Sequence, residues 1–203
     1  EWFERMPFGI LPRTSDNTGS IVGCSRQDAK AHTFKPLYGG VSGTEDQKRY
    51  YNAFKEKYNQ VTKWHERLQK DAVIKKYIQL PSGRQYAFPK ARWTEWGTAT
   101  DRTAICNYPV QGFATADLLP MALVRLEKMM RWRKLNSVIC NTVHDSIVLD
   151  VHPDEKDACI NLLSDAMLSL PTETQNRYGV EYDMPVGIEL KIGKNWLDLE
   201  EVP

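Results

Sequence analysis

Four residues spaced four apart, Arg26, Lys30, Phe34 and Tyr38, form the first group whose types could do chemistry. On an α-helix each step of four advances only about 40° around the axis, so the four side chains share an arc of about 120° and span about 18 Å. Two cations on that face could neutralise a triphosphate, and two rings could pack on a sugar and a base. The alternative is a surface helix with two solvated cations and two aromatic core residues.

A second group, Arg102, Asn107 and Gln111, lies in the segment DRTAICNYPVQGFATAD. Because Pro109 lies between the two amides, we expect them at the start of a helix rather than inside one. Neutral amides at such a place could donate to the minor-groove acceptors of base pairs. Capping and local turn hydrogen bonds are the simpler alternative.

The third group is His144-Asp145-Ser146, between the apolar runs SVICNTV and IVLDV. This pattern predicts a strand, a tight turn and a second strand. A turn between two buried strands would hold Asp145 rigidly and facing outward. Such a carboxylate suits Mg²⁺, which takes one or two carboxylates together with phosphate oxygens. The alternative is an ordinary turn residue, because turns favour Asp.

The elements that must position these groups follow from periodicity and turn residues. Ser25 is a good N-cap for the first helix, and Gly39-Gly40 would stop it. Pro120 would bend the helix expected over 111–134. We expect helices over about 25–37, 45–76, 111–134 and 153–169, a hairpin over 77–89 around Pro81-Ser82-Gly83, and a strand near 185–192. Together with the turn at Asp145, this is an α+β pattern.

Composition excludes several classes of protein. No run of eighteen apolar residues occurs, so a membrane span is excluded, and a cytoplasmic setting is expected. The four cysteines lie far apart in no zinc-like array, and we interpret them as reduced, mostly buried thiols. Residues 1–140 hold 23 Lys and Arg against 13 Asp and Glu, whereas residues 141–203 hold 4 against 13. This asymmetry is typical of a protein that presents one face to a polyanion, although two solvated faces of opposite sign would also explain it.

In this order, the segments resemble motifs of family A DNA polymerases, the Pol I-like class. RQDAKAHTFKPLYGG resembles motif B, the R-x3-K-x3-F-x3-YG pattern of the nucleotide-binding helix. LPSGRQYAFP resembles the hairpin stretch that follows motif B, and NYPVQGFATAD resembles the N-x-P-x-Q-G-x-A-A-D segment. VHDSIVLDV resembles motif C, and VGIELKIGKNWLDLEE the closing segment. The resemblance runs from about residue 25 to 198, and the residues in these motifs look most similar to those of bacteriophage members.

The resemblance implies a role for each matching residue. Arg26 and Lys30 would contact the incoming triphosphate, and Lys30 would donate a proton to the leaving pyrophosphate. Phe34 would pack on the sugar and discriminate against dideoxynucleotides. Tyr38 would stack near the templating base, with Gly39 permitting the turn behind it.

The remaining matches concern the DNA and the metal. Asn107 and Gln111 would contact the minor groove of the primer-template, and Arg102 would join them. His144 would approach the primer terminus, and Asp145 would bind the catalytic Mg²⁺ ions. The implied reaction is two-metal transfer of a nucleotide from a dNTP to a primer 3′-hydroxyl.

The sequence also departs from the family pattern. Motif A, the D-Y-S-x-I-E-L-R strand with the other metal-binding Asp, is not matched in this sequence, and Ser146 stands where Glu is common. One Asp cannot hold two Mg²⁺ ions about 3.5–4 Å apart in a productive clamp. We therefore expect this chain to be inactive alone. It would be either an excised fragment or the C-terminal piece of a split polymerase, paired with an N-terminal remainder that carries motif A.

The implied architecture is α+β: helical fingers over residues 1–92, and over 93–203 an incomplete palm in which the hairpin at Asp145 and a C-terminal strand form a small antiparallel sheet. The expected partners are primer-template DNA, dNTPs and the N-terminal remainder, in a bacterial host or a phage-infected cell. Two alternatives remain. A non-catalytic fragment could hold DNA or a partner through the basic residues of positions 1–140. A metal-dependent hydrolase using His144 and Asp145 would have no use for Arg26 and Lys30.

Overall fold

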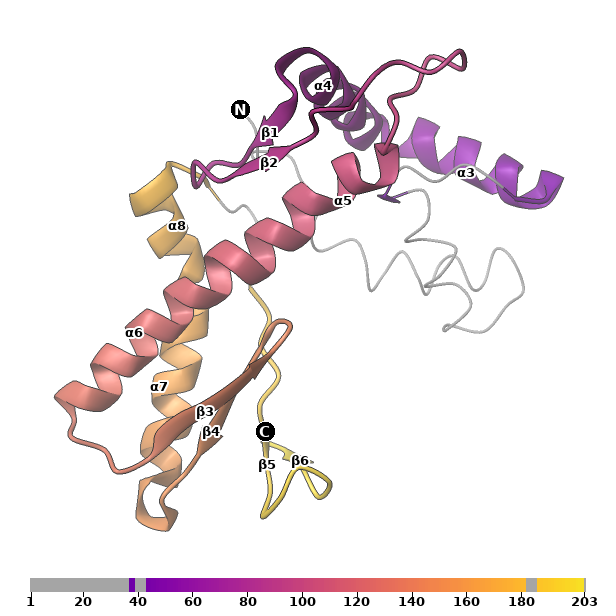
Figure 1. Cartoon of the computed structure of the whole chain (residues 1–203). Coiled ribbons are helices and arrows are strands. Elements are labelled where there is room, and N and C mark those ends of the chain that lie inside the picture. Colours follow the sequence, from indigo (N-terminus) through magenta and orange to yellow (C-terminus); the bar gives the residue numbers. More distant parts are fainter. Residues whose placement is uncertain (1–36, 39–42, 182–185, 203) are drawn as a thin grey trace. The chain divides into compact units, whose positions relative to one another are not determined.

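The structure is a computed structural model that describes residues 37–38, 43–181 and 186–202 (Figure 1). The chain divides into two compact units, Glu1–Phe113 and Ala114–Pro203, and each is described by itself. The predicted division between fingers and palm at residue 92 is a functional one and stays a prediction. The predicted helix over about 25–37 lies outside the described residues except for its end, where Leu37 is helical and Tyr38 lies in a turn.

The first unit contains three described helices and one hairpin. They are α3 (Glu45–Lys57), α4 (Asn59–Lys75), β1 (Tyr77–Gln79), β2 (Gln85–Ala87) and α5 (Arg102–Gly112). The single helix expected over 45–76 is therefore two helices. Tyr58, with φ −110° and ψ 52°, leaves the helical range and separates α3 from α4. The hairpin is confirmed, and Gly83 takes the φ of 87° that its turn requires.

The core of the first unit forms where α4 meets the hairpin and α5. The helical spacing of Val61, Trp64, Leu68 and Ala72 predicts an apolar stripe on α4. Trp64, Leu68 and Ala72 are buried, which confirms it, whereas Val61 is only partly buried. The three buried residues pack with Ile78 of β1 and Ile105 of α5. The same core fixes the position of α5, which carries the second group of candidate residues.

The helix expected from Gln111 begins earlier, at Arg102. Pro109 lies inside α5, so the expectation that Asn107 and Gln111 stand at the start of a helix is wrong. Because proline has no N–H group, Pro109 removes one backbone hydrogen bond from α5. The packing around the helix tolerates this loss. A π-helical segment, Phe113–Leu118, follows α5. Pro120 lies in the first turn of the next helix, directly after this segment, and the bend predicted there stays a prediction.

The second unit packs helices against one hairpin (Figure 1). Its elements are α6 (Leu119–Trp132), β3 (Val138–Val143), β4 (Ser146–Asp150), a 3₁₀ turn (Pro153–Glu155), α7 (Lys156–Leu168), α8 (Leu170–Tyr178), β5 (Lys191–Ile192) and β6 (Glu200–Glu201). The helix expected over 153–169 is the 3₁₀ turn followed by α7, and α8 was not expected. The strand expected over 185–192 is limited to Lys191–Ile192, because its partner β6 is only two residues long.

The predicted hairpin around Asp145 is confirmed, but its strands are not both buried. Ile147 and Leu149 of β4 pack against the cluster that includes Leu126 of α6 and Leu162 of α7. By contrast, Val138 at the start of β3 is 53% exposed. The reason is that helices cover one face of the hairpin, and among the described residues β3 pairs only with β4.

The α+β class is confirmed, with three separate two-stranded antiparallel sheets in the described part of the chain. The hairpin at Asp145 and the C-terminal strand lie in different sheets, which differs from the single small sheet that we expected. No helix among the described residues is long and apolar enough to cross a membrane. Of the three described cysteines, all free, Cys106 and Cys159 are buried and Cys140 is exposed; Cys24 lies outside the described residues.

Candidate active site

The described structure joins one predicted nucleotide-binding residue to one predicted DNA-binding residue. Gln111, on the last turn of α5, donates a hydrogen bond from Nε2 to the hydroxyl oxygen of Tyr38 at 3.1 Å. The two residues are 73 positions apart in sequence, so only the fold brings them together. Arg26, Lys30, Phe34 and Gly39 lie outside the described residues, and their roles stay predictions.

Arg102 and Asn107, the other two members of the second group, lie on α5 with Gln111. Asn107 and Gln111 are four residues apart and therefore share a face of the helix. Within the described part of the chain, Arg102 Nε and Asn107 Oδ1 are buried without a hydrogen-bond partner. A buried polar atom in that state costs about 1–3 kcal/mol. Arg102 lies five positions before Asn107, so it points to a different face of α5 from the two amides.

His65 of α4 is a buried polar residue beside this group that the sequence did not single out. Burial and the nearby Arg102 cation lower the pKa of His65 to about 4, against the opposing effect of a hydrogen bond to the Leu37 backbone. The imidazole is therefore neutral at physiological pH, between the end of the motif B helix and the start of α5. The only sequence signal was its spacing of four from Gln69, which is also buried.

Gly112 ends α5 at a place where no side chain fits. A Cβ built there would lie 1.8 Å from the hydroxyl oxygen of Tyr86 on β2. The Tyr86 ring also packs against Tyr108 of α5, with centroids 5.5 Å apart. The glycine that follows Gln111 is thus required for the hairpin to approach α5, and this approach holds Gln111 in place.

The tip of the second unit's hairpin presents His144 and Asp145 to solvent. Val143 pairs with Ser146, so the turn consists of these two residues, and Ser146 is the first residue of β4. His144 has a φ of 55°, a conformation that two-residue hairpin turns require. The Ser146 hydroxyl donates to the Val143 carbonyl at 2.8 Å and closes the turn. The prediction that Asp145 faces outward is confirmed.

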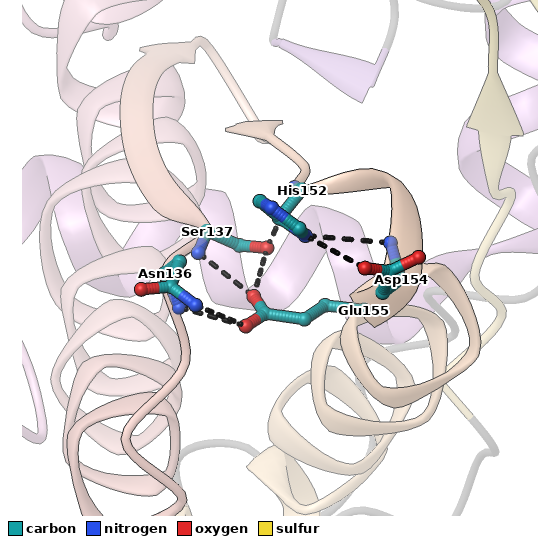
Figure 2. A network of polar contacts seen from close by, with 5 residues as sticks. All are labelled: Asn136, Ser137, His152, Asp154 and Glu155. Carbon is teal, nitrogen blue, oxygen red and sulfur yellow. Dashed lines mark hydrogen bonds and ion pairs between the residues drawn. The ribbon is translucent and has the colours of Figure 1, made fainter.

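The base of the same hairpin is held by a network centred on Glu155 (Figure 2). One carboxylate oxygen accepts from the backbone and side-chain nitrogens of Asn136 at 2.9 and 3.1 Å. The other accepts from the Ser137 backbone N–H at 2.9 Å and from its hydroxyl at 2.6 Å. Ser137 Oγ in turn accepts from the His152 backbone N–H at 2.9 Å. The residues just before β3 and just after β4 are thus tied together.

Electrostatics strengthen this network. Hydrogen bonds from the Asn136 backbone and the Ser137 side chain are the main causes that lower the pKa of Glu155 to about 2. The carboxylate is therefore charged throughout the physiological range, and its four hydrogen bonds are charge-assisted. Sequence reasoning missed this residue, because an acidic residue in the first turn of a helix is common without any further role.

Asp145 is the predicted metal ligand among the described residues. Its carboxylate is an oxygen ligand of the kind that Mg²⁺ prefers, and the turn presents it to solvent. No group of three or more His, Cys, Asp or Glu side chains with metal-binding geometry occurs among the described residues. Asp145 therefore fits a Mg²⁺ site as one ligand, and such a site needs others from substrate phosphates or from further protein residues.

Comparisons with known proteins agree with these features. The model of DNA polymerase family A matches residues 17–198. DNA polymerase I of Lactococcus lactis is 28% identical, covering 94% of this chain and 21% of that protein. The thermostable DNA polymerase I of Thermus aquaticus is 29% identical over 87% of this chain and 21% of that protein. The DNA polymerase of Bacillus phage SP01 is 30% identical over 80% of this chain and 18% of that protein.

A solved structure shares the fold. The POL domain of Pol1 from M. smegmatis, solved with DNA primer-template and dNTP, matches with a TM-score of 0.68 at 19% identity, covering 80% of this chain and 33% of that chain. The present chain spans about a fifth of the length of the curated relatives it matches. Since the family model matches most of the sequence, the chain belongs to DNA polymerase family A.

Proposed function

We propose that this chain is the C-terminal portion of a template-dependent DNA polymerase that adds dNTPs to a primer 3′-hydroxyl. The observation that carries the proposal is Asp145, exposed at the two-residue turn of a hairpin whose base is fixed by Glu155. An exposed carboxylate in a fixed turn would serve as one oxygen ligand of Mg²⁺. Family membership indicates the class of reaction, and the hairpin holds Asp145 exposed at a fixed turn.

Each of the candidate residues would have its own role in nucleotide transfer. Arg26 and Lys30 would neutralise the triphosphate, and Lys30 would protonate the leaving pyrophosphate. Phe34 would pack against the sugar, and Tyr38 would lie near the templating base. The hydrogen bond from Gln111 to Tyr38 supports this last role. It would connect the position of the Tyr38 ring to α5, the helix that would contact the duplex.

The DNA and the metal would be held by the other candidates. Asn107 and Gln111 would contact the minor groove with Arg102 beside them, and His144 would approach the primer terminus. Asp145 would hold Mg²⁺, which when bound neutralises the charge that develops on the phosphates. The unpaired Oδ1 of Asn107 is an acceptor, and in the minor groove it could accept only from the amino group of guanine.

We further propose that the chain does not polymerise alone. Asp145 is a single carboxylate, and a two-metal clamp needs at least one more. Among the described residues β3 pairs only with β4, and this supports a further strand beside the hairpin, because such a strand would pair with the other edge of β3. A strand of the motif A type, D-Y-S-x-I-E-L-R, would bring the second carboxylate with it.

Primer extension tests this proposal. The 203-residue chain alone should give no Mg²⁺-dependent incorporation, and adding a polypeptide that carries motif A should restore it. Robust incorporation by the chain alone would contradict the claim of incompleteness. DNA binding that never becomes incorporation, even with the added polypeptide, would favour the second candidate, a non-catalytic DNA-binding fragment. The excess of 18 Lys and Arg over 11 Asp and Glu in residues 1–113 is the observation that favours that candidate.

A further inference from the structure

The segment 92–100 of the first unit is a short loop closed on itself by hydrogen bonds. At its tip, the Gly97 N–H donates to the Thr94 carbonyl at 3.1 Å, and Gly97 has a φ of 70°. Behind the tip, the Thr94 N–H donates to the Thr98 carbonyl at 2.8 Å, and the Thr94 hydroxyl donates to the same carbonyl at 2.9 Å. The tip is therefore a defined turn.

The base of this loop is anchored in the core. The Thr100 N–H donates to the Arg92 carbonyl at 2.9 Å. Ala91 and Ala99 are both buried in the cluster formed by α4, the β1–β2 hairpin and α5. The Ala99 N–H donates at 3.0 Å to Oε1 of Gln69, a buried side chain of α4. Loop 92–100 is thus fixed in shape before it meets any partner.

What this fixed loop displays is two indole rings. Trp96, inside the turn, is 82% exposed, and Trp93 is 48% exposed. Large apolar rings in an ordered position are costly to leave in water, and aromatic residues on rigid supports are typical of binding surfaces. Because the backbone of the loop is already fixed, little backbone entropy is lost when the rings bind a partner. The loop therefore has the properties of an interaction surface.

The charges around the loop select the class of partner. Lys90 and Arg92 are exposed beside the rings, and Glu95 is the one acidic residue between positions 88 and 100. Over residues 1–113 the cations exceed the acidic residues by seven. A partner with negative charge and flat rings complements this surface, and single-stranded nucleic acid has both. A duplex fits less well, because its bases are already stacked on one another.

We propose that loop 92–100 binds single-stranded nucleic acid, with unpaired bases stacking on Trp96 and Trp93 and phosphates contacting Lys90 and Arg92. Base–aromatic stacking needs no particular sequence, because every base has a π-face. Which strand binds here follows from the proposed function, and on this point the proposal rests on it. A polymerase must hold the unpaired part of its template. The binding itself requires no catalysis, so it can be measured on this chain alone.

Fluorescence anisotropy of the 203-residue chain with a labelled oligothymidylate of about 20 nucleotides tests the proposal. Trp96→Ala should bind about tenfold more weakly, the size expected for one lost stack. Trp96→Phe should keep much of the affinity, because a smaller ring still stacks. The matched control is Trp196→Ala, since Trp196 is 60% exposed but close in sequence to Asp198, Glu200 and Glu201. That variant should bind like the unchanged chain.

An abasic oligonucleotide of the same length separates stacking from charge. On it, Trp96→Ala and the unchanged chain should bind equally, whereas Arg92→Ala should weaken binding to both oligonucleotides. Unchanged affinity of Trp96→Ala for oligothymidylate, with circular dichroism showing a folded chain, would overturn the proposal and leave a protein as the partner of the loop. Failure of nucleotide incorporation by the chain mixed with a polypeptide that carries motif A, with the binding results as expected, would overturn only the proposed function.

Discussion

At the scale of single residues, the residues around helix α5 matter because of the groups that they contact. The bond between Gln111 and Tyr38 links two residues that the motifs assign to different ligands. His65 and Gly112 belong to no chemical pattern, yet they adjoin the same helix α5. Two predictions follow from the surroundings of these last two residues.

Gly112→Ala should destabilise the chain by about 1–3 kcal/mol, the usual cost of forcing an extra group into a packed site. The reason is the 1.8 Å that would separate the new Cβ from the Tyr86 hydroxyl. Urea denaturation measures the loss, and Tyr86→Ala in the same chain should recover part of it. Gly187→Ala, where nothing lies within 4 Å of the new Cβ, is the control. Equal stability of the two glycine variants would contradict the close approach.

The pH dependence of stability should show the buried His65. Its pKa is about 4 in the folded chain and 6.5 in the reference state, so protons favour the unfolded state. Its contribution is present above pH 6.5 and is lost as the pH falls toward 4. Between pH 7 and pH 5 this amounts to about 2 kcal/mol. An NMR titration of the imidazole protons checks the cause directly, and a midpoint near 6.5 would show that His65 is not buried as described.

At the scale of elements, the hairpin β3–β4 shows what fixes the turn that carries Asp145. Its tip is held by Ser146 and its base by Glu155, so Asp145 is positioned from both ends. The sequence predicted the turn, because two apolar runs flank a polar tripeptide. It did not predict the clamp at the base, because the clamp joins residues 18 and 19 positions apart through a loop and a helix start.

Glu155→Gln should loosen the base of the hairpin. A Gln side chain offers one acceptor oxygen where the carboxylate accepts four hydrogen bonds, so the amides of Asn136 and Ser137 should exchange with solvent at least about tenfold faster. Hydrogen exchange measures this effect. Asp154→Asn is the matched control, since its exposed carboxylate lies on the same turn but outside the Glu155 contacts. Equal exchange in both variants would show that Glu155 does not hold the hairpin.

The other differences between expectation and structure have the same origin. Helical periodicity placed the buried stripe of α4 correctly, because that stripe is a local property of the sequence. It could not show that Tyr58 breaks the first long helix, or that α5 begins at Arg102 and contains Pro109. Those outcomes depend on tertiary packing, which overrides the local preference of a proline or an aromatic residue.

At the scale of the whole molecule, the chain spans about a fifth of the length of its curated relatives. The proposal that it is catalytically incomplete depends on motif A, which its sequence does not match. Family membership was predictable because several motifs occur in the right order, although each alone had an ordinary explanation. The loop with Trp96 was not predictable in this way, since its exposure follows from hydrogen bonds that close the turn and anchor its base.

The most direct test of the central claim is single-nucleotide incorporation by the chain mixed with a polypeptide that carries motif A. Asp145→Ala should lower the rate by about a hundredfold or more, as expected when charge stabilisation of the reacting phosphates is lost. Asp150→Ala, at the other end of the same hairpin, should leave the rate nearly unchanged. Incorporation that survives Asp145→Ala, or that falls equally in both variants, would contradict the assignment of Asp145 as the metal-binding residue of this chain.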